Sequence, residues 1–148
     1  MSYFRGKHSC KLDAKGRLAL PAKVKSALPE STGNKLFIGH GFEPCLVLYP
    51  VVEYKKKESQ ILGLDDYDPE NRRLKRSFFE NHYDMELDSA NRFLISKGDL
   101  AYAKLEKEVL LIGLGDKIEV WSPEVYEAYT TGSAEEYSKL VQKKLSEE

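Results

Sequence analysis

The chain has 148 residues, of which 41% are hydrophobic and 32% are charged, and its formal net charge is −1. Such a composition is typical of a globular chain with one core or two small fused ones. The balance of charge excludes a protein that coats nucleic acid or acidic membranes through bulk charge alone. No apolar run approaches the roughly 20 residues that span a bilayer, and the N-terminal MSYFRGKHSCKLD lacks the apolar segment of a secretory signal. We therefore expect a cytosolic protein with no membrane partner.

An internal repeat organises the chain. LDAKGRLALP at residues 12–21 is matched by LDSANRFLIS at residues 87–96, and both stretches contain Leu-Asp-x-x-x-Arg. Two later blocks repeat as well: IGHG (38–41) with IGLG (112–115), and LVLY (46–49) with IEVW (118–121). The repeat predicts two related halves, at residues 1–54 and 83–129.

Each half is predicted to run strand, strand, short helix, strand, strand, helix. In the first half, alternating apolar residues at 10–12 and 17–20 indicate two strands joined by the Asp-x-x-Gly-Arg turn. AKVKSAL then forms a short helix after Pro21, and KLFIGHGF with CLVLYP forms a second hairpin. Pro50 and its counterpart Pro123 suit the first turn of the helix that follows.

Residues 55–82 break the repeat and are predicted to be a helical connector. KKKESQILGL and PENRRLKRSFFENHY read as helices, with Leu74, Phe78 and Phe79 on one face of the second. Residues 130–148 form a C-terminal amphipathic helix, which begins with a capping box and carries an apolar stripe of Tyr137, Leu140, Val141 and Leu145. The stripe fits an exposed helix and a subunit contact equally well.

The two Leu-Asp-x-x-x-Arg stretches predict matching turns. Gly16 supplies a positive φ in the first turn, and Asn91, which tolerates that conformation, replaces it in the second. An aspartate at the start of such a turn can hold the arginine that follows it in a bidentate pair, which fixes the direction of the guanidinium. On spacing alone, a structural clip and a ligand contact remain equally good interpretations.

Charge is unevenly distributed along the chain. Residues 1–25 contain seven basic residues against one acidic residue, Asp13, whereas residues 103–148 contain six basic residues against ten acidic ones. The first half therefore offers a local basic patch that can meet phosphates, or that merely keeps the surface soluble.

Enzymatic and metal-binding functions have little support. His8 with Cys10, and His40 with Cys45, lack the spacing of common zinc motifs, and no Ser-His-Asp order or phosphate-cradling glycine loop is present. We expect no enzyme, no metal and no cofactor, and two unpaired cysteines that are dispensable for binding, since their neighbours do not gather metal ligands.

FRG at 4–6, the two Leu-Asp-x-x-x-Arg stretches, CLVLYP at 45–50 and LIGLGDKIEVWSPEVYEAY at 111–129 resemble the MraZ family of bacterial transcriptional regulators. The resemblance implies an α+β fold in which two AbrB-like swapped-hairpin β-barrel halves interlock, with short helices on the periphery. It also implies a ring-shaped homo-oligomer. The partner implied is double-stranded DNA, bound at direct repeats in the promoter of the protein's own division and cell-wall gene cluster, which places the protein at the nucleoid.

The resemblance assigns DNA contacts to individual positions. Those positions are Asp13, Lys15 and Arg17 in the first turn, Asp88 and Arg92 in the second, and Arg5 in the N-terminal FRG. Relatives commonly have glycine and proline where the second turn here has Asn91 and Ser96, and Ala90 stands opposite Lys15. Together with the acidic residues Asp84, Glu86, Asp88 and Asp99, this predicts a weaker role for the second turn. The alternative function is a protein-interaction module that binds an acidic partner through the basic face.

Interlocked halves also predict a shared core. The residues expected to be buried together are Leu12, Leu18, Leu20, Leu46, Leu48, Leu87, Phe93, Ile95, Ile118 and Val120.

Overall fold

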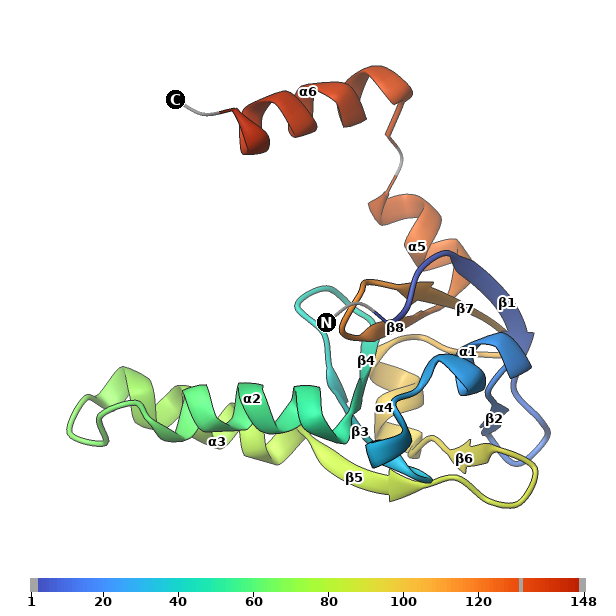
Figure 1. The fold of residues 1–148 in the computed structure, drawn as a ribbon, viewed down its shortest axis with the longest axis horizontal. Helices are drawn as coiled ribbons and strands as arrows, with labels where there is room; N and C mark the ends of the chain where they lie inside the picture. The colour runs from blue at the N-terminus through green and yellow to red at the C-terminus, as the bar shows by residue number, and fades with distance from the viewer. Residues whose placement is uncertain (1–2, 131, 147–148) are drawn as a thin grey trace.

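The computed structural model describes residues 3–130 and 132–146 (Figure 1). The first repeat comprises β1 (Lys7–Lys11), β2 (Arg17–Ala19), α1 (Ala22–Ala27), the 3-10 turn η1 (Glu30–Thr32), β3 (Lys35–His40), β4 (Leu46–Pro50) and α2 (Val51–Leu62). The remaining elements are α3 (Pro69–Asn81), β5 (Tyr83–Glu86), β6 (Arg92–Leu94), α4 (Lys97–Tyr102), β7 (Glu108–Gly113), β8 (Ile118–Trp121), α5 (Pro123–Tyr129) and α6 (Ala134–Leu145). The predicted order of elements is confirmed in both repeats.

Helix starts follow the signals in the sequence. Pro50 is the N-cap residue of α2, and Pro123 lies in the first turn of α5, where its missing N–H costs no helical hydrogen bond. The predicted capping box of α6 is present: the Ser133 side chain accepts from the Glu136 N–H, and the Glu136 side chain accepts from the Ser133 N–H.

Strands of the two repeats are interleaved in two antiparallel sheets. The larger sheet has the order β1-β7-β8-β4-β3-β5, so β1 extends the β7–β8 hairpin of the second repeat and β5 extends the β3–β4 hairpin of the first. The smaller sheet pairs β2 with β6. Each repeat thus contributes one strand that pairs with the hairpin of the other repeat. The predicted α+β fold of two interlocked halves is confirmed.

The strand registers reveal an approximate two-fold relation between the repeats. Leu18 lies opposite Phe93 at the centre of the β2–β6 ladder, and Val47 lies opposite Glu119 at the centre of the β4–β8 ladder. Both pairs join positions that correspond in the two repeats. The β1–β7 and β3–β5 ladders are then two copies of one pairing.

One of the sequence matches between the two repeats is out of register by a single residue. His8 and Tyr83, which correspond in the two repeats, pair with Leu111 and Ile38. Ile38 is therefore equivalent to Leu111, not to Ile112 as the IGHG and IGLG blocks suggest. Burial agrees, because Ile38 and Leu111 are both fully buried and Ile112 is only half-buried. A shift of one residue turns a strand's side chains to the opposite face.

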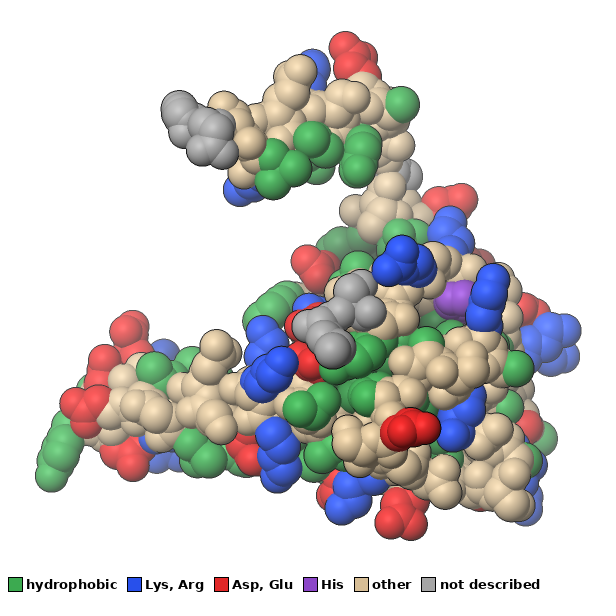
Figure 2. All heavy atoms as spheres, viewed as in Figure 1, with side chains coloured by type: hydrophobic (Ala, Val, Ile, Leu, Met, Phe, Trp, Pro, Cys, Tyr) green, Lys and Arg blue, Asp and Glu red, His purple; other side chains and the backbone are tan. Residues whose placement is uncertain are grey.

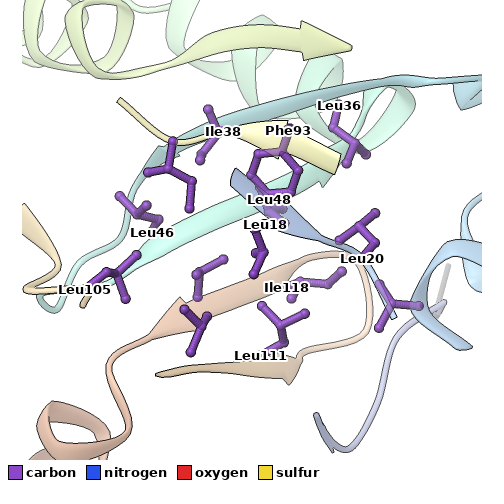
Figure 3. Packing of buried hydrophobic residues seen from close by; sticks show 14 of the residues in the cluster. Leu18, Leu20, Leu36, Ile38, Leu46, Leu48, Phe93, Leu105, Leu111 and Ile118 are labelled. Carbon is purple, nitrogen blue, oxygen red and sulfur yellow. The ribbon is translucent and has the colours of Figure 1, made fainter. Parts of the chain in front are cut away.

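The two sheets enclose one core (Figure 3). All ten residues predicted to be buried together belong to it, and none is more than 9% exposed. Leu18 and Phe93 lie on the inner side of the β2–β6 ladder and attach the small sheet to the large one. Burial of each such side chain contributes about 1.5–3 kcal/mol to the stability of the fold, so the small sheet is packed firmly against the large one.

Two helical segments project from this body (Figure 1). The α2–α3 hairpin is anchored where the Tyr54 ring stacks on Phe37, with ring centroids 3.8 Å apart, and on Phe78. Leu74 and Phe79, predicted to share a helical face with Phe78, are 44% and 41% exposed. None of the described helices is both long and apolar enough to cross a bilayer.

Helix α6 stands away from the body, and every residue in it is exposed. Its hydrophobic side chains gather along the side that faces the rest of the molecule (Figure 2). The predicted stripe is therefore present and lacks a packing partner within residues 3–130 and 132–146.

Candidate nucleic-acid interface

The first turn is closed by one carboxylate. Asp13 Oδ1 accepts the backbone N–H groups of Lys15 and Arg17 at 2.9 and 2.8 Å, and Asp13 Oδ2 accepts Arg17 Nε–H at 2.7 Å. Backbone hydrogen bonds from Asp13 N–H to the Arg17 carbonyl and from Gly16 N–H to the Asp13 carbonyl complete the turn. A single side chain thus fixes both the path of the backbone and the direction of the arginine.

The second turn repeats this arrangement bond for bond. Asp88 Oδ1 accepts the N–H groups of Ala90 and Arg92, each at 2.9 Å, and Asp88 Oδ2 accepts Arg92 Nε–H at 3.0 Å. The backbone hydrogen bonds also correspond, with Asn91 in the place of Gly16. The two turns therefore present their arginines in the same way.

The bidentate pair expected from the sequence does not form. Arg17 uses only Nε toward Asp13, and within residues 3–130 and 132–146 its Nη groups make no hydrogen bond. Arg92 does the same with Asp88. The hydrogen bond from Nε–H to the aspartate orients each guanidinium. The edge that carries the Nη groups is available for a second, bidentate partner.

A residue with positive φ shapes each turn, and its carbonyl accepts a hydrogen bond from the other repeat. Gly16 has φ +84° and Asn91 has φ +59°, as the sequence predicted. The Gly16 carbonyl accepts Ile95 N–H at 3.1 Å, and the Asn91 carbonyl accepts Leu20 N–H at 3.0 Å. Neither turn is an independent loop, because each is fixed by a strand of the opposite repeat.

Both arginines lie on one face of the β2–β6 ladder. Side chains alternate along a strand, so Arg17 and Arg92 lie on the outer face, while Leu18 and Phe93 lie on the inner one. Arg17 and Arg92 are diagonal neighbours across the ladder, a position in which side chains are typically ~7–8 Å apart. Leu94, on the same outer face, is 60% exposed. The ladder is a small exposed platform with an arginine turn at each end.

The turn carboxylates remain charged at neutral pH. The backbone N–H of Arg17 lowers the pKa of Asp13 from its ordinary value, and the Arg17 guanidinium adds to the effect. The backbone N–H of Arg92 likewise lowers the pKa of Asp88. An ionised aspartate repels phosphate, so these residues orient the arginines rather than contact an anionic ligand themselves.

Arg5 lies apart from both turns. It lines a cavity of about 510 Å³ beside α1, together with Lys7, His8 and Lys23. Seven residues of mostly extended chain lie between it and Asp13, which corresponds to roughly 25 Å. The structure brings Asp13, Arg17 and their counterparts together on one platform and leaves Arg5 at the far end of β1.

Two of the acidic residues expected to surround the second turn have partners in the structure. Asp84 forms an ion pair with Lys35 at 3.3 Å. Asp99 is buried, and its carboxylate accepts from Tyr83 OH at 2.6 Å and lies 3.0 Å from His40 Nε2. These contacts reduce the negative field of Asp84 and Asp99 at the second turn, whereas Glu86 is exposed, so the weaker role of this turn stays a prediction.

One group of possible metal ligands was not identified from the sequence. Glu43, Cys45 and Glu119 place their donor atoms within 4.8 Å of one another. Cys45 and Glu119 meet because β4 pairs with β8, an arrangement that no local spacing reveals. Burial raises the pKa of the Cys45 thiol to about 12. The expectation that the cysteines' neighbours do not gather ligands is therefore wrong for Cys45, although both cysteines carry free thiols.

Comparison with known proteins finds the same repeat. Residues 3–77 and 78–146 each match the family model described as "MraZ protein, putative antitoxin-like". A protein named "Transcriptional regulator MraZ" from Cytophaga hutchinsonii is 40% identical over 99% of this chain and 97% of its own length. Proteins of the same name from Marinobacter nauticus and Pseudomonas syringae pv. syringae are 39% and 38% identical, over 90% and 84% of this chain and 91% and 83% of their own lengths. With both halves matched and such relatives along most of its length, this chain belongs to the MraZ family.

Proposed function

We propose that this protein is a transcriptional regulator that binds double-stranded DNA in a sequence-specific manner through its two Asp-x-x-x-Arg turns. The observation that carries the proposal is the platform formed by β2 and β6. Two arginines with matching hydrogen bonds lie there on one exposed face, each with its Nη groups unoccupied by the described residues. The names of the relatives support a role in transcription.

Each part of the turn has a separate task in this proposal. Arg17 and Arg92 read base edges in the major groove, where a guanidinium pairs with guanine through two hydrogen bonds. Asp13 and Asp88 hold the arginines in the direction required. Lys15, which is exposed beside Arg17, contacts a phosphate and so fixes the position of the turn without reading sequence.

Affinity then comes from several copies acting together. One chain offers only two turn arginines, Arg17 and Arg92, and a small number of phosphate contacts gives weak binding at physiological salt. We propose a ring of identical subunits that engages direct repeats in the promoter of the protein's own division and cell-wall gene cluster. Linked binding sites raise the overall affinity without any new contact. The protein would act in the cytoplasm, at the nucleoid.

The C-terminal helix supplies a surface for such assembly. A twelve-residue helix is marginally stable by itself, yet α6 leaves Tyr137, Leu140, Val141 and Leu145 exposed. A closed ring needs head-to-tail contacts, so the stripe of one copy would lie on the next copy. Replacing Leu140 by Glu should then give smaller particles in size-exclusion chromatography with light scattering. Gln142→Glu, which adds the same charge on the polar side of α6, should not.

Binding to DNA can be tested with one titration. Fluorescence anisotropy would follow a labelled duplex from upstream of the protein's own gene and a scrambled duplex of equal length, between 50 and 300 mM salt. Sequence-specific DNA binding predicts preference for the first duplex and a linear fall of log affinity with log salt of about 0.9 per phosphate contact. Failure to bind either duplex would contradict the proposal and favour the alternative, an acidic protein partner on the basic face.

A further inference from the structure

We propose that Lys97, which the second repeat contributes, completes a DNA-phosphate site beside the first turn together with Lys15. The inference rests on the DNA binding proposed above and assigns a contact to a residue outside both turns. It also gives the chain, which is nearly two-fold symmetric, a preferred orientation on DNA.

The site is a cavity of about 410 Å³ between the first turn and the start of α4. Residues from both repeats line it, among them Asp13, Lys15, Gly16, Ser96, Lys97 and Glu106. The hydrogen bond from Ile95 N–H to the Gly16 carbonyl joins its two walls two residues before Lys97. A Cβ at Gly16 would lie 3.5 Å from Leu100 Cδ1, which shows how closely α4 approaches the turn. The hydrogen bond between Ile95 and Gly16 and the close approach of α4 therefore fix the position of Lys97 beside the first turn.

The charges of the cavity favour an anion. Lys15 and Lys97 are both exposed, and neither forms an ion pair with any residue in the described ranges. Asp13 is already held by Arg17, so Glu106 is the lining carboxylate that opposes an anion. Two flexible ammonium groups from separate segments suit a backbone phosphate, since lysine acts as a point charge and does not demand a fixed geometry.

The corresponding positions at the second turn are both alanine. Helices α1 and α4 each have six residues and begin at Ala22 and Lys97, which lie 75 residues apart like the turns themselves. Ala90 likewise replaces Lys15. The approximate two-fold relation thus places two lysines at one end of the platform and two alanines at the other. Because phosphate contacts fix register and orientation, this difference sets which way the chain lies on a direct repeat.

The test compares two single-charge variants on DNA. Lys97→Ala is measured beside Lys57→Ala, which removes an exposed lysine from α2, on the far side of the molecule from the platform. Anisotropy titrations use the upstream duplex and the scrambled duplex at several salt concentrations. Thermal unfolding confirms that both variants remain folded.

A phosphate contact by Lys97 predicts weaker binding of both duplexes, on the order of tenfold at 0.1 M salt, and a salt slope reduced by about one contact. Lys57→Ala should change neither quantity measurably. Equal losses from the two variants would show an effect of bulk charge and overturn the inference. A loss on the upstream duplex alone would show base reading by Lys97 and also overturn it. If wild-type protein binds neither duplex, the proposed function itself fails, and this result is seen before any variant is compared.

Discussion

The two turns share one internal geometry and differ in what surrounds them. Each aspartate accepts two backbone N–H groups and one Nε–H, at distances that agree within 0.3 Å between the turns. At the first turn, Lys15 and Lys97 line the adjoining cavity, whereas Ala90 and Ala22 stand at the corresponding places of the second.

This difference separates two requirements of recognition. The aspartate and the residue of positive φ hold the arginine in position, and both turns meet this requirement equally. Neighbouring cations attract the phosphate backbone, and the first turn has lysines at two positions where the second has alanines. Substitutions at the arginines and at the flanking positions can separate the two requirements.

Loss of the first arginine should have the largest effect. Arg17→Ala is expected to cost ~1–3 kcal/mol per engaged turn, the usual value of a bidentate contact to a base, and to abolish binding when multiplied over an oligomer. Gel shifts on DNA with two repeats would measure this, after sizing has shown that the variant still assembles. Unchanged binding would remove the DNA hypothesis for this turn.

Loss of the second arginine should weaken binding less. Arg92→Ala removes the same guanidinium from an equally well-formed turn, but one with alanines at the positions of Lys15 and Lys97, which would hold the phosphate backbone close. The same gel shifts would rank the two variants. Equal losses would mean that the turn geometry alone decides the contribution of each arginine.

A gain of charge at the second turn should strengthen binding. Ala90 is exposed, and its N–H bonds to Asp88 as the Lys15 N–H bonds to Asp13, so Ala90→Lys fits the existing backbone. One added phosphate contact predicts an increase on the order of tenfold at 0.1 M salt. Ser89→Lys, one residue earlier, is the matched control for added charge. If both variants gain equally, position within the turn does not matter.

The aspartate clips should produce a small dependence of stability on pH. Because the folded pKa of Asp13 is lowered, its contribution is complete above the unfolded value of about 3.9 and is lost as the pH falls through the folded value. The melting temperature of Asp13→Asn should therefore lie below that of wild type at pH 7, and the difference should shrink as the pH falls below about 4. Asp88→Asn should behave alike. A difference that does not change with pH would show that the charge of the clip adds no stability.

Local patterns in the sequence predicted both turns and most of the core. Gly16 and Asn91 were identifiable because few residues adopt positive φ, and the repeated Asp and Arg marked the turns. Hydrophobic alternation identified the inner residues of β2 and β6, since a strand has a period of two.

Features that depend on the interlocking of the repeats were not predictable in this way. Lys97 lies beside a turn 80 residues earlier in the chain, and Asp99 is turned inward to Tyr83 and His40. Both placements follow from the pairing of β2 with β6 and the packing of α4. Neither placement can be recognised from the neighbouring residues in the sequence.

An exchange of the flanking cations tests the central claim most directly. A variant with Lys15→Ala, Lys97→Ala, Ala22→Lys and Ala90→Lys keeps the net charge and moves both lysines from the first turn to the second. Anisotropy on the upstream duplex would then compare Arg17→Ala with Arg92→Ala in this background. We predict that their order reverses, so that Arg92→Ala becomes the more damaging change. If Arg17→Ala remains the more damaging one by the same factor as in wild type, the flanking lysines do not set the difference between the turns.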